Sequence, residues 1–293
     1  MVTETAIDLI EKQDWLDKAG ETLQPAVVEA FKAGGATGQE IKNALHGKWL
    51  GHPLHPVITD VPLGAWTTAL ALDALEALGG RKEFAPGADA AIAVGLVGAV
   101  GSAVTGLTDW SATTGQKRKI GLAHGLLNVT GTLLYATSLL LRRGKKRGAG
   151  MGVAALGYAV TGAAAYLGGH LVYGEQVGVD HTATAQEYPH RYVPVMAEAD
   201  LPENKLTRVE AKGVPVLLVR REERIYAIAE TCSHLGGPLA EGTLEGDTVR
   251  CPWHHSSFSL EDGSVVDSPA TAPQPCFEVR VQNGQIEVRA ADK

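Results

Sequence analysis

The chain has 293 residues, of which 45% are hydrophobic and 20% charged, with a formal net charge of -7 and three cysteines. This composition excludes a disordered chain, a disulfide-stapled scaffold and a basic nucleic-acid-binding protein. The mean hydropathy is zero, but the average hides two unlike halves. Segments 120–141 and 148–174 contain no Asp, Glu, Lys or Arg, whereas the chain after residue 174 is charged and rich in Val, Ile and Thr. We therefore predict a membrane α-helical bundle joined to a soluble domain.

The first part of the chain is typical of an amphipathic helical segment, which we place at residues 1–50. Apolar side chains such as Ile7, Leu16 and Val28 recur at roughly helical spacing among acidic ones. The residues after Met1 lack the basic region, the short apolar core and the small-residue cleavage site that make up a signal peptide. We therefore expect no cleaved signal peptide.

Four apolar stretches come next, and each is close to the length of about 20 residues that crosses a bilayer as a helix. They cover roughly residues 57–78, 88–107, 120–141 and 151–172. The second contains Gly95, Gly98 and Gly101, and small residues let membrane helices approach closely. We predict four transmembrane helices within residues 51–175. The alternative, a four-helix bundle buried in a soluble protein, needs polar faces that the third and fourth stretches lack.

A linker at residues 176–189 precedes segments with the short apolar pattern of β-strands. These strand-like segments are 214–219, 225–229, 243–251, 277–281 and 286–289. Asn283-Gly284 lies between the last two, and Asn-Gly between alternating apolar residues is a strong hairpin signal. We predict a small all-β domain over residues 190–293.

Two loops of this β domain each offer one thiol and one imidazole. Cys232 and His234 form a C-x-H motif, and after sixteen further residues Cys251 and His254 form a C-x-x-H motif. Thiolates and imidazoles are ligands of zinc and of iron–sulfur clusters. Glycine and proline flank both loops and permit tight turns around an inorganic group. A structural zinc site is one interpretation, although zinc sites more often pair Cys with Cys and His with His in each half.

The spacing of these motifs resembles that of the Rieske [2Fe-2S] family. The resemblance implies that Cys232 and Cys251 hold one iron of the cluster and that His234 and His254 hold the other. Imidazoles in place of two thiolates leave the cluster less negative and easier to reduce. A [2Fe-2S] cluster is therefore the expected cofactor, with one cluster per chain.

Several further positions can be compared with high-potential Rieske subunits of quinol-oxidising complexes. Ser256 stands where those subunits have a serine that hydrogen-bonds a bridging sulfide. Gly237 and Trp253 stand where they have two disulfide-bonded cysteines, and Phe258 where a tyrosine hydrogen-bonds a cysteine sulfur. The loss of one hydroxyl donor lowers the potential. The loops therefore resemble those of Rieske-type ferredoxins, and we predict an intermediate or low potential.

Other residues near the motifs have simpler expected roles. The resemblance implies that a proline-rich segment, with Pro269, Pro273 and Pro275, covers the cluster. His255 adjoins a candidate ligand but lies outside the pattern, and we interpret it as a surface histidine. Cys276 belongs to neither loop, and we expect a buried or unreactive thiol.

The membrane half has its own resemblance. The opening Gly51-His52-Pro53-Leu54-His55-Pro56 resembles that of the domain-of-unknown-function family 2231, which comprises small four-span bacterial membrane proteins. The likeness covers roughly residues 46–175. The family name supplies no activity.

Alternation of four spans would bring several ionisable residues to one membrane face. This candidate membrane-face site contains His52, His55, Asp60, Asp109, His124 and His170. Ionisable groups at membrane depth usually mark a pathway or a site. We consider a haem bound by two of His55, His124 and His170, or a quinone pocket that exchanges electrons with the cluster. A haem would be non-covalent, because the chain has no C-x-x-C-H motif. The alternative is structural, with histidines that cap helix ends.

The connections between the spans carry Lys and Arg, which bear on orientation. The first and third connections hold seven of them (two and five), against five on the other side. The third has Arg142, Arg143, Lys145, Lys146 and Arg147. The positive-inside rule then places the β domain outside, as a weak bias of two charges. Arg142-Arg143 also resembles an internal twin-arginine signal. Against this orientation, an N-terminal tail of about 50 residues would cross without a signal.

The sequence thus predicts a multi-pass cell-membrane protein that carries single electrons. Expected partners are membrane lipid and an electron donor or acceptor protein, with quinone as a further candidate; no nucleic-acid partner is expected. The alternative is a redox-sensing or structural subunit of a larger complex. We expect an electron carrier or oxidoreductase component rather than a stand-alone enzyme. A Rieske terminal oxygenase needs a mononuclear iron in a large following domain, and only 39 residues follow His254.

Overall fold

The computed structural model describes residues 2–183 and 188–291, and it divides into two compact units. The helical unit comprises Met1–Gly38 and Pro53–Val177, and the β unit comprises Gln39–His52 and Gly178–Lys293. The described part of the chain has seven α-helices, followed by ten β-strands. A helical N-terminal region followed by an all-β region is therefore confirmed.

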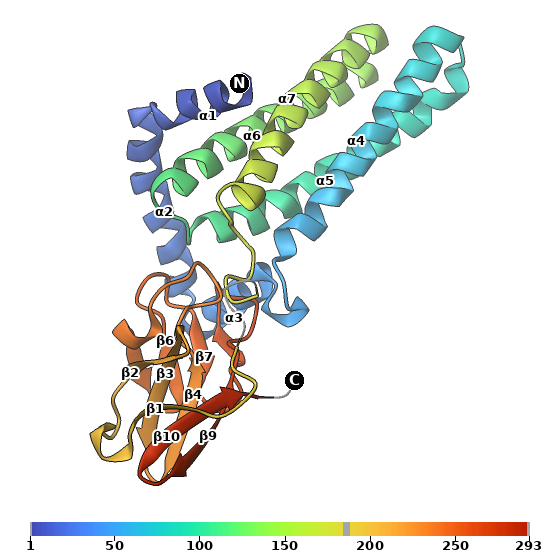
Figure 1. Ribbon diagram of the computed structural model, residues 1–293. Helices are drawn as coiled ribbons and strands as arrows, with labels where there is room; N and C mark the ends of the chain where they lie inside the picture. Colours follow the sequence, from blue (N-terminus) through green and yellow to red (C-terminus); the bar gives the residue numbers. More distant parts are fainter. Residues whose placement is uncertain (1, 184–187, 292–293) are drawn as a thin grey trace. The chain divides into compact units, whose positions relative to one another are not determined.

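Four long helices dominate the helical unit. They are α4 (Leu54–Gly79), α5 (Ala85–Trp110), α6 (Gly115–Arg143) and α7 (Arg147–Tyr173). Helix α4 pairs closely with α5, and α6 with α7, as two antiparallel hairpins (Figure 1). At 26 to 29 residues each, the helices are about 40 Å long. The shorter α1 (Val2–Glu11) and α2 (Asp14–Ala33) contact α6.

Small residues hold the helices of each hairpin together. Gly95 lies against Trp66 so closely that an added Cβ would be 2.2 Å from the indole nitrogen. Gly98 and Gly101 also face α4. Trp66 in turn stacks on Tyr135 of α6, with ring centres 4.1 Å apart. The predicted role of the glycine repeat in close helix approach therefore agrees with the packing.

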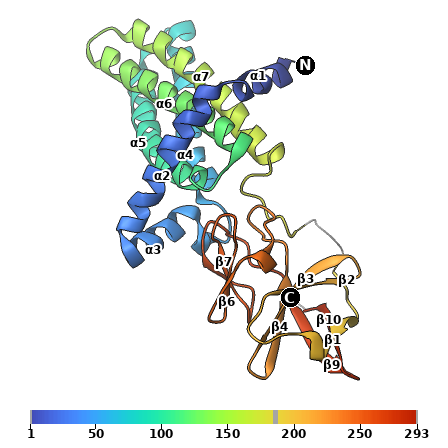
Figure 2. The same ribbon diagram turned by 90° about the vertical axis from the view of Figure 1, so that its left-hand side faces the viewer.

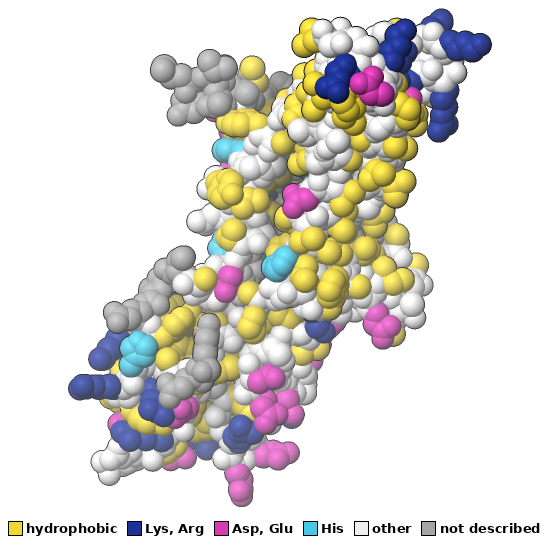
Figure 3. Space-filling view, turned by 90° about the vertical axis from the view of Figure 1, so that its right-hand side faces the viewer, with side chains coloured by type: hydrophobic (Ala, Val, Ile, Leu, Met, Phe, Trp, Pro, Cys, Tyr) yellow, Lys and Arg dark blue, Asp and Glu magenta, His cyan; other side chains and the backbone are white. Residues whose placement is uncertain are grey.

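Large apolar side chains point away from the helical unit on all four long helices. The most exposed include Val57, Val61 and Leu78 on α4, Val94, Val97 and Val100 on α5, Leu126, Leu133 and Leu140 on α6, and Leu156 on α7. Apolar side chains cover a flank of the helical unit, and Lys and Arg gather at one end (Figure 3). By length and composition, two helices of the described chain qualify as membrane spans, Lys82–Trp110 and Arg147–Tyr173. That α4 and α6 also cross a membrane stays a prediction.

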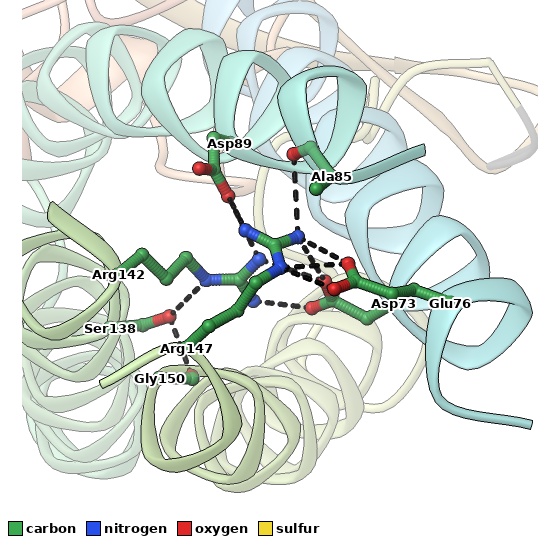
Figure 4. A network of polar contacts seen from close by, with 8 residues as sticks. All are labelled: Asp73, Glu76, Ala85, Asp89, Ser138, Arg142, Arg147 and Gly150. Carbon is green, nitrogen blue, oxygen red and sulfur yellow. Dashed lines mark hydrogen bonds and ion pairs between the residues drawn. The ribbon is translucent and has the colours of Figure 1, made fainter. Parts of the chain in front are cut away.

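One end of the four helices is joined by a buried charge network (Figure 4). The side chain of Arg142 is fully buried and binds Asp73 of α4 through both terminal nitrogens and Asp89 of α5 at 3.0 Å. Arg147 binds Asp89 at 2.8 Å and Glu76 at 2.6 Å. Both arginines lie within helices, which corrects their assignment to the connection. The network contains groups from all four helices.

Replacement of Arg142 should destabilise the helical unit strongly. Arg142→Met leaves the buried Asp73 without its main partner, and breaking such a buried pair costs about 3–5 kcal/mol. We expect a clear drop in the thermal unfolding midpoint in detergent, followed by circular dichroism. Arg81→Gln is the control, because Arg81 and Glu83 form an exposed pair and should change stability by less than about 1 kcal/mol. Equal midpoints for Arg142→Met and the unmodified protein would contradict the stabilising role of the network.

The β unit contains three antiparallel sheets (Figure 2). The first has strand order β1 (Val193–Ala197), β10 (Gln285–Ala290), β9 (Phe277–Gln282), and the second β2 (Thr207–Ala211), β3 (Val214–Arg221), β4 (Arg224–Ala229). The third contains β5 (Thr243–Glu245), β6 (Thr248–Arg250), β7 (Ser257–Ser259) and β8 (Val265–Asp267). Strand β3 separates two apolar clusters: Val216 and Leu218 face one, and Leu217 and Val219 face the other.

The strand predictions hold with one correction. Strands β3 and β4 and the β9–β10 hairpin appear where expected, and Asn283 and Gly284 both have positive φ. The predicted strand 243–251 is instead two strands, because Gly246 adopts a φ of +59° and turns the chain between them. Left-handed backbone of this kind favours glycine.

A short piece of the N-terminal segment belongs to the β unit. Helix α3 (Gly35–His46) ends in this unit, and there the Asn43 side chain donates to Asp267 at 3.1 Å and accepts from the Ser268 amide at 2.9 Å. Lys48 donates to the Val266 carbonyl at 2.6 Å. The β unit therefore contains residues that precede the four long helices in the sequence and residues that follow them.

Candidate metal centre

Two loops of the β unit close with the same backbone hydrogen bonds. In the first, the Cys232 amide donates to the Gly237 carbonyl at 2.8 Å, and the Gly236 amide donates back to the Cys232 carbonyl at 2.9 Å. In the second, the Cys251 amide donates to the Ser256 carbonyl at 2.8 Å, and the His255 amide donates to the Cys251 carbonyl at 3.2 Å. The two cysteines thus occupy equivalent positions.

This equivalence explains why a histidine that is not a candidate ligand, His255, follows His254. The residue four places after each cysteine has left-handed backbone, with φ of +75° at Gly236 and +64° at His255. His255 is exposed, as expected for a surface histidine. Its place in the turn, rather than ligation, accounts for its position beside a candidate ligand.

The four side chains of the motif form two pairs. Cys232 and Cys251 are buried, and each thiol shifts the pKa of the other. The interaction with Cys232 lowers the pKa of Cys251 to about 7, whereas the interaction with Cys251, together with burial, raises the pKa of Cys232 well above its ordinary value. His234 and His254 are half-buried, with ring centres 5.1 Å apart and planes at 81°.

Space for an inorganic group is kept by a glycine. A Cβ added at Gly237 would lie 2.9 Å from the Cys251 sulfur and 3.1 Å from the Trp253 ring. The fully buried Ser256 accepts a hydrogen bond from the Ala270 amide at 2.9 Å, so its hydroxyl hydrogen points elsewhere. A buried sulfur pair, a half-buried nitrogen pair and a glycine between the loops fit a two-iron cluster.

A buried glutamine joins the first loop to the proline-rich segment. Gln274 accepts from the Ser233 amide at 2.9 Å and donates to the carbonyls of Ala229 and Thr231, both at 2.9 Å. Ser233 also donates to the Ala272 carbonyl at 2.8 Å. The sequence motif did not reveal Gln274, and the only local signal was a polar residue between two prolines.

Comparison with known proteins decides the family. Residues 191–278 match a family model described as Rieske [2Fe-2S] domain. Ferredoxin CarAc of Metapseudomonas resinovorans is 35% identical over 103 residues, which are 35% of this chain and 96% of that relative. The chain belongs to the Rieske [2Fe-2S] family. Its cofactor is accordingly a [2Fe-2S] cluster.

Three further matches add to this comparison. The 3-phenylpropionate/cinnamic acid dioxygenase ferredoxin subunit of Escherichia coli (strain K12) is 39% identical over 89 residues, 30% of this chain and 83% of that relative. A solved ferredoxin of carbazole 1,9a-dioxygenase from Nocardioides aromaticivorans IC177 is 27% identical, covers 33% of this chain and 96% of its own, and has a TM-score of 0.32. Residues 51–181 match a family described as a predicted membrane protein, DUF2231.

The chain just before the Rieske domain also contacts the first cluster loop. His181 donates its amide to the Ser233 carbonyl at 3.0 Å, and Asp180 accepts from the Thr182 amide at 2.8 Å. Part of the predicted linker 176–189 therefore packs on the loop, and residues 184–187 lie outside the described chain.

The third cysteine of the chain stays outside the cluster loops. Cys276 is half-buried, and its thiol approaches the Gln274 carbonyl at 3.7 Å. Burial raises its pKa, with a further contribution from Asp262. A raised pKa lowers the thiolate fraction, in agreement with an unreactive thiol.

Among the six candidate membrane-face residues, the structure brings the rings of His55 and His124 together. His55 and His124 have ring centres 6.4 Å apart. His170 instead lies 3.9 Å from Glu175, and Asp60 is exposed on α4. Asp109 is on α5 and acts electrostatically on His55, and His52 belongs to the β unit. No group of three or more His, Cys, Asp or Glu among the described residues is arranged to hold a single metal ion.

A methyl group at position 237 should interfere with cluster loading. Gly237→Ala places a Cβ 2.9 Å from the Cys251 sulfur, so we expect fewer irons and acid-labile sulfides per purified chain. Gly236→Ala is the matched control: its φ is positive, but the nearest atom is 3.9 Å from the added Cβ, and His255 already tolerates a side chain at the equivalent position. Full loading of Gly237→Ala would show that the loops can separate at no cost.

Proposed function

We propose that this protein is a membrane-anchored Rieske-type carrier that passes single electrons between a membrane donor or acceptor, quinone or haem, and a partner protein. The observation that carries this proposal is the pair of equivalent loops, which present two buried thiols and two half-buried imidazoles. The bound cluster supplies a one-electron redox couple. The protein determines how closely a partner can approach the cluster, and it sets the reduction potential of the cluster.

Cys232 and Cys251 are the proposed ligands of one iron, and His234 and His254 those of the other. The buried cysteine end is shielded from water by the apolar cluster of Leu217, Ile228 and Phe258, among others. The half-buried imidazole end is the route by which a partner can approach. The similarity to a ferredoxin and to the ferredoxin subunit of a dioxygenase supports a protein as one electron partner.

The helical unit supports anchoring in the lipid of a cell membrane by four spans. All four long helices carry large apolar side chains outward, while glycine and paired charges lie inward, as expected where lipid surrounds the bundle. In addition, Gln39–His52 and Gly178–Lys293 belong to one compact unit. The intervening chain must therefore start and end on one side of a membrane, which requires an even number of crossings. The excess of Lys and Arg in the first and third connections favours a position of these connections in the cytoplasm and of the Rieske domain on the outer side of the membrane.

The ligand assignment can be tested with two cysteine variants of the full chain. Cys251→Ala should lose the electron paramagnetic resonance signal of the reduced cluster, because one thiolate ligand is removed. Cys276→Ala should keep it, since Cys276 lies in neither loop. Retention of the signal in Cys251→Ala, in protein with an unchanged circular dichroism spectrum, would contradict the ligand set.

The same variants test electron transfer in vesicles. Quinol should reduce the cluster of Cys276→Ala and of the unmodified protein, and a soluble one-electron acceptor should oxidise it again within repeated turnovers. Cys251→Ala should show neither step. A cluster that follows the ambient potential but carries no flux would favour a redox-sensing subunit instead.

The potential depends on hydroxyl donors at the cluster. Ser256 is fully buried, and its oxygen already accepts from Ala270, which leaves its hydrogen for the proposed cluster contact. Ser256→Ala should lower the midpoint potential by about 100 mV, because a hydrogen bond to a charged acceptor is worth about 2 kcal/mol. Ser257→Ala is the control, a neighbouring buried serine on β7. Equal shifts in both variants would contradict a specific role for Ser256.

A further inference from the structure

The helical unit brings the rings of two histidines from separate hairpins close together. His55 is on α4 and His124 on α6, with ring centres 6.4 Å apart and planes at 89°. Each ring also lies against a glycine of the helix with which its own helix pairs. A Cβ added at Gly106 would be 2.7 Å from the His55 ring, and one at Gly168 would be 3.0 Å from the His124 ring.

The hydrogen-bond partners assign the same tautomer to both rings. Nδ1 of His124 lies 2.8 Å from the Ala164 carbonyl, which can only accept, so this nitrogen carries the hydrogen. Nε2 then bears the lone pair, in agreement with the Asn128 amide nitrogen, a donor, at 3.1 Å.

His55 reaches the same state through a threonine. Its Nδ1 lies 3.2 Å from the Thr105 hydroxyl oxygen. That hydroxyl donates its own hydrogen to a backbone carbonyl, Gly101 at 3.0 Å or Ser102 at 3.2 Å. The oxygen therefore accepts from His55, and Nε2 of His55 also bears a lone pair. Metal-bound histidines commonly donate their second nitrogen to a protein oxygen in this way.

The separation of the rings selects the ligand. Two imidazoles on opposite sides of one metal atom, each bound at about 2 Å, have ring centres about 6 Å apart. A quinol hydrogen-bonded to both rings would instead separate the two nitrogens by about 11 Å, the width of its ring plus two hydrogen bonds. The observed 6.4 Å agrees with the metal atom. A haem iron needs only two axial ligands, because the macrocycle supplies the other four nitrogens.

We propose that His55 and His124 are the axial ligands of a non-covalent haem held between the α4–α5 and α6–α7 hairpins. This inference rests on the proposed function and names the redox group of its membrane half. Attachment is non-covalent because the chain has no C-x-x-C-H motif.

The test uses the full chain, purified in detergent from cells supplied with a haem precursor. Visible spectra of the oxidised and reduced protein should show a Soret band, and the pyridine haemochrome assay should give one haem per chain. His55→Ala and His124→Ala should each lower haem content at least about tenfold, since even positioning partners of ligating histidines are worth 10–100-fold in affinity. His170→Ala, the matched control at the end of α7, should retain haem.

Two further measurements keep failure of the variants interpretable. The resonance signal of the Rieske cluster, measured in the same samples, reports whether each variant chain folds. Titration of the unmodified protein with haemin requires no variant and should give a low-spin spectrum with two nitrogen axial ligands. His55→Met should retain haem with a shifted spectrum, because methionine also ligates haem iron.

The outcomes separate the two proposals. A Soret band that is absent after haemin titration, or that persists in His55→Ala and His124→Ala, overturns the haem site. If the cluster is then still reduced by quinol and oxidised by a soluble acceptor, the proposed electron-transfer function stands without haem. If quinol does not reduce the cluster of the unmodified protein and a soluble acceptor does not oxidise it, the proposed function is refuted, whatever the haem content.

Discussion

In each cluster loop the cysteine amide donates to the carbonyl five residues later, and the amide four residues later donates back to the cysteine carbonyl. This reciprocal pair of bonds closes a tight turn that points each thiol toward the other loop. The turn requires left-handed backbone at the fourth residue after the cysteine. Gly236 adopts this conformation without strain, whereas His255 adopts it at a conformational cost. The imidazoles and Ser256 are positioned by the same turns.

The surroundings of the loops hold these turns in register. Strand β3 contributes Leu217 and Val219 to the apolar cluster that buries both cysteines. Gln274 then fixes the first loop to the proline-rich segment, and Asn43 fixes the end of that segment at Ser268 to α3. The loops are short, but their geometry depends on contacts from chain more than 200 residues apart.

Local patterns were readable from the sequence, and long-range contacts were not. The motif spacing indicated the loops because ligand positions lie within a few residues, and Asn283-Gly284 indicated the hairpin because its turn needs two left-handed residues. Gln274 and Asn43 carry no such local signature, since their partners are defined only by the fold. Arg142 was misassigned for the same reason: its partners Asp73 and Asp89 lie 69 and 53 residues away. The length and apolar faces of α4–α7 were predictable, whereas the pairing of two hairpins was not.

The helical unit distributes its polar groups unevenly along the long helices. The charge network of Arg142 and Arg147 joins the helices where α4 ends and α5 begins, and the pair of His55 and His124 lies toward the opposite end. Between them, Trp66 stacks on Tyr135 in an apolar core. Buried charges are tolerable only when paired, so Arg142 and Asp73 can lie inside this end of the unit, while Arg147 and Asp89 stay partly exposed. Neutral histidines that donate from Nδ1 need no counter-ion, which allows them to occupy the other end as an uncharged pair, and Nε2 of His124 accepts from the Asn128 amide at 3.1 Å.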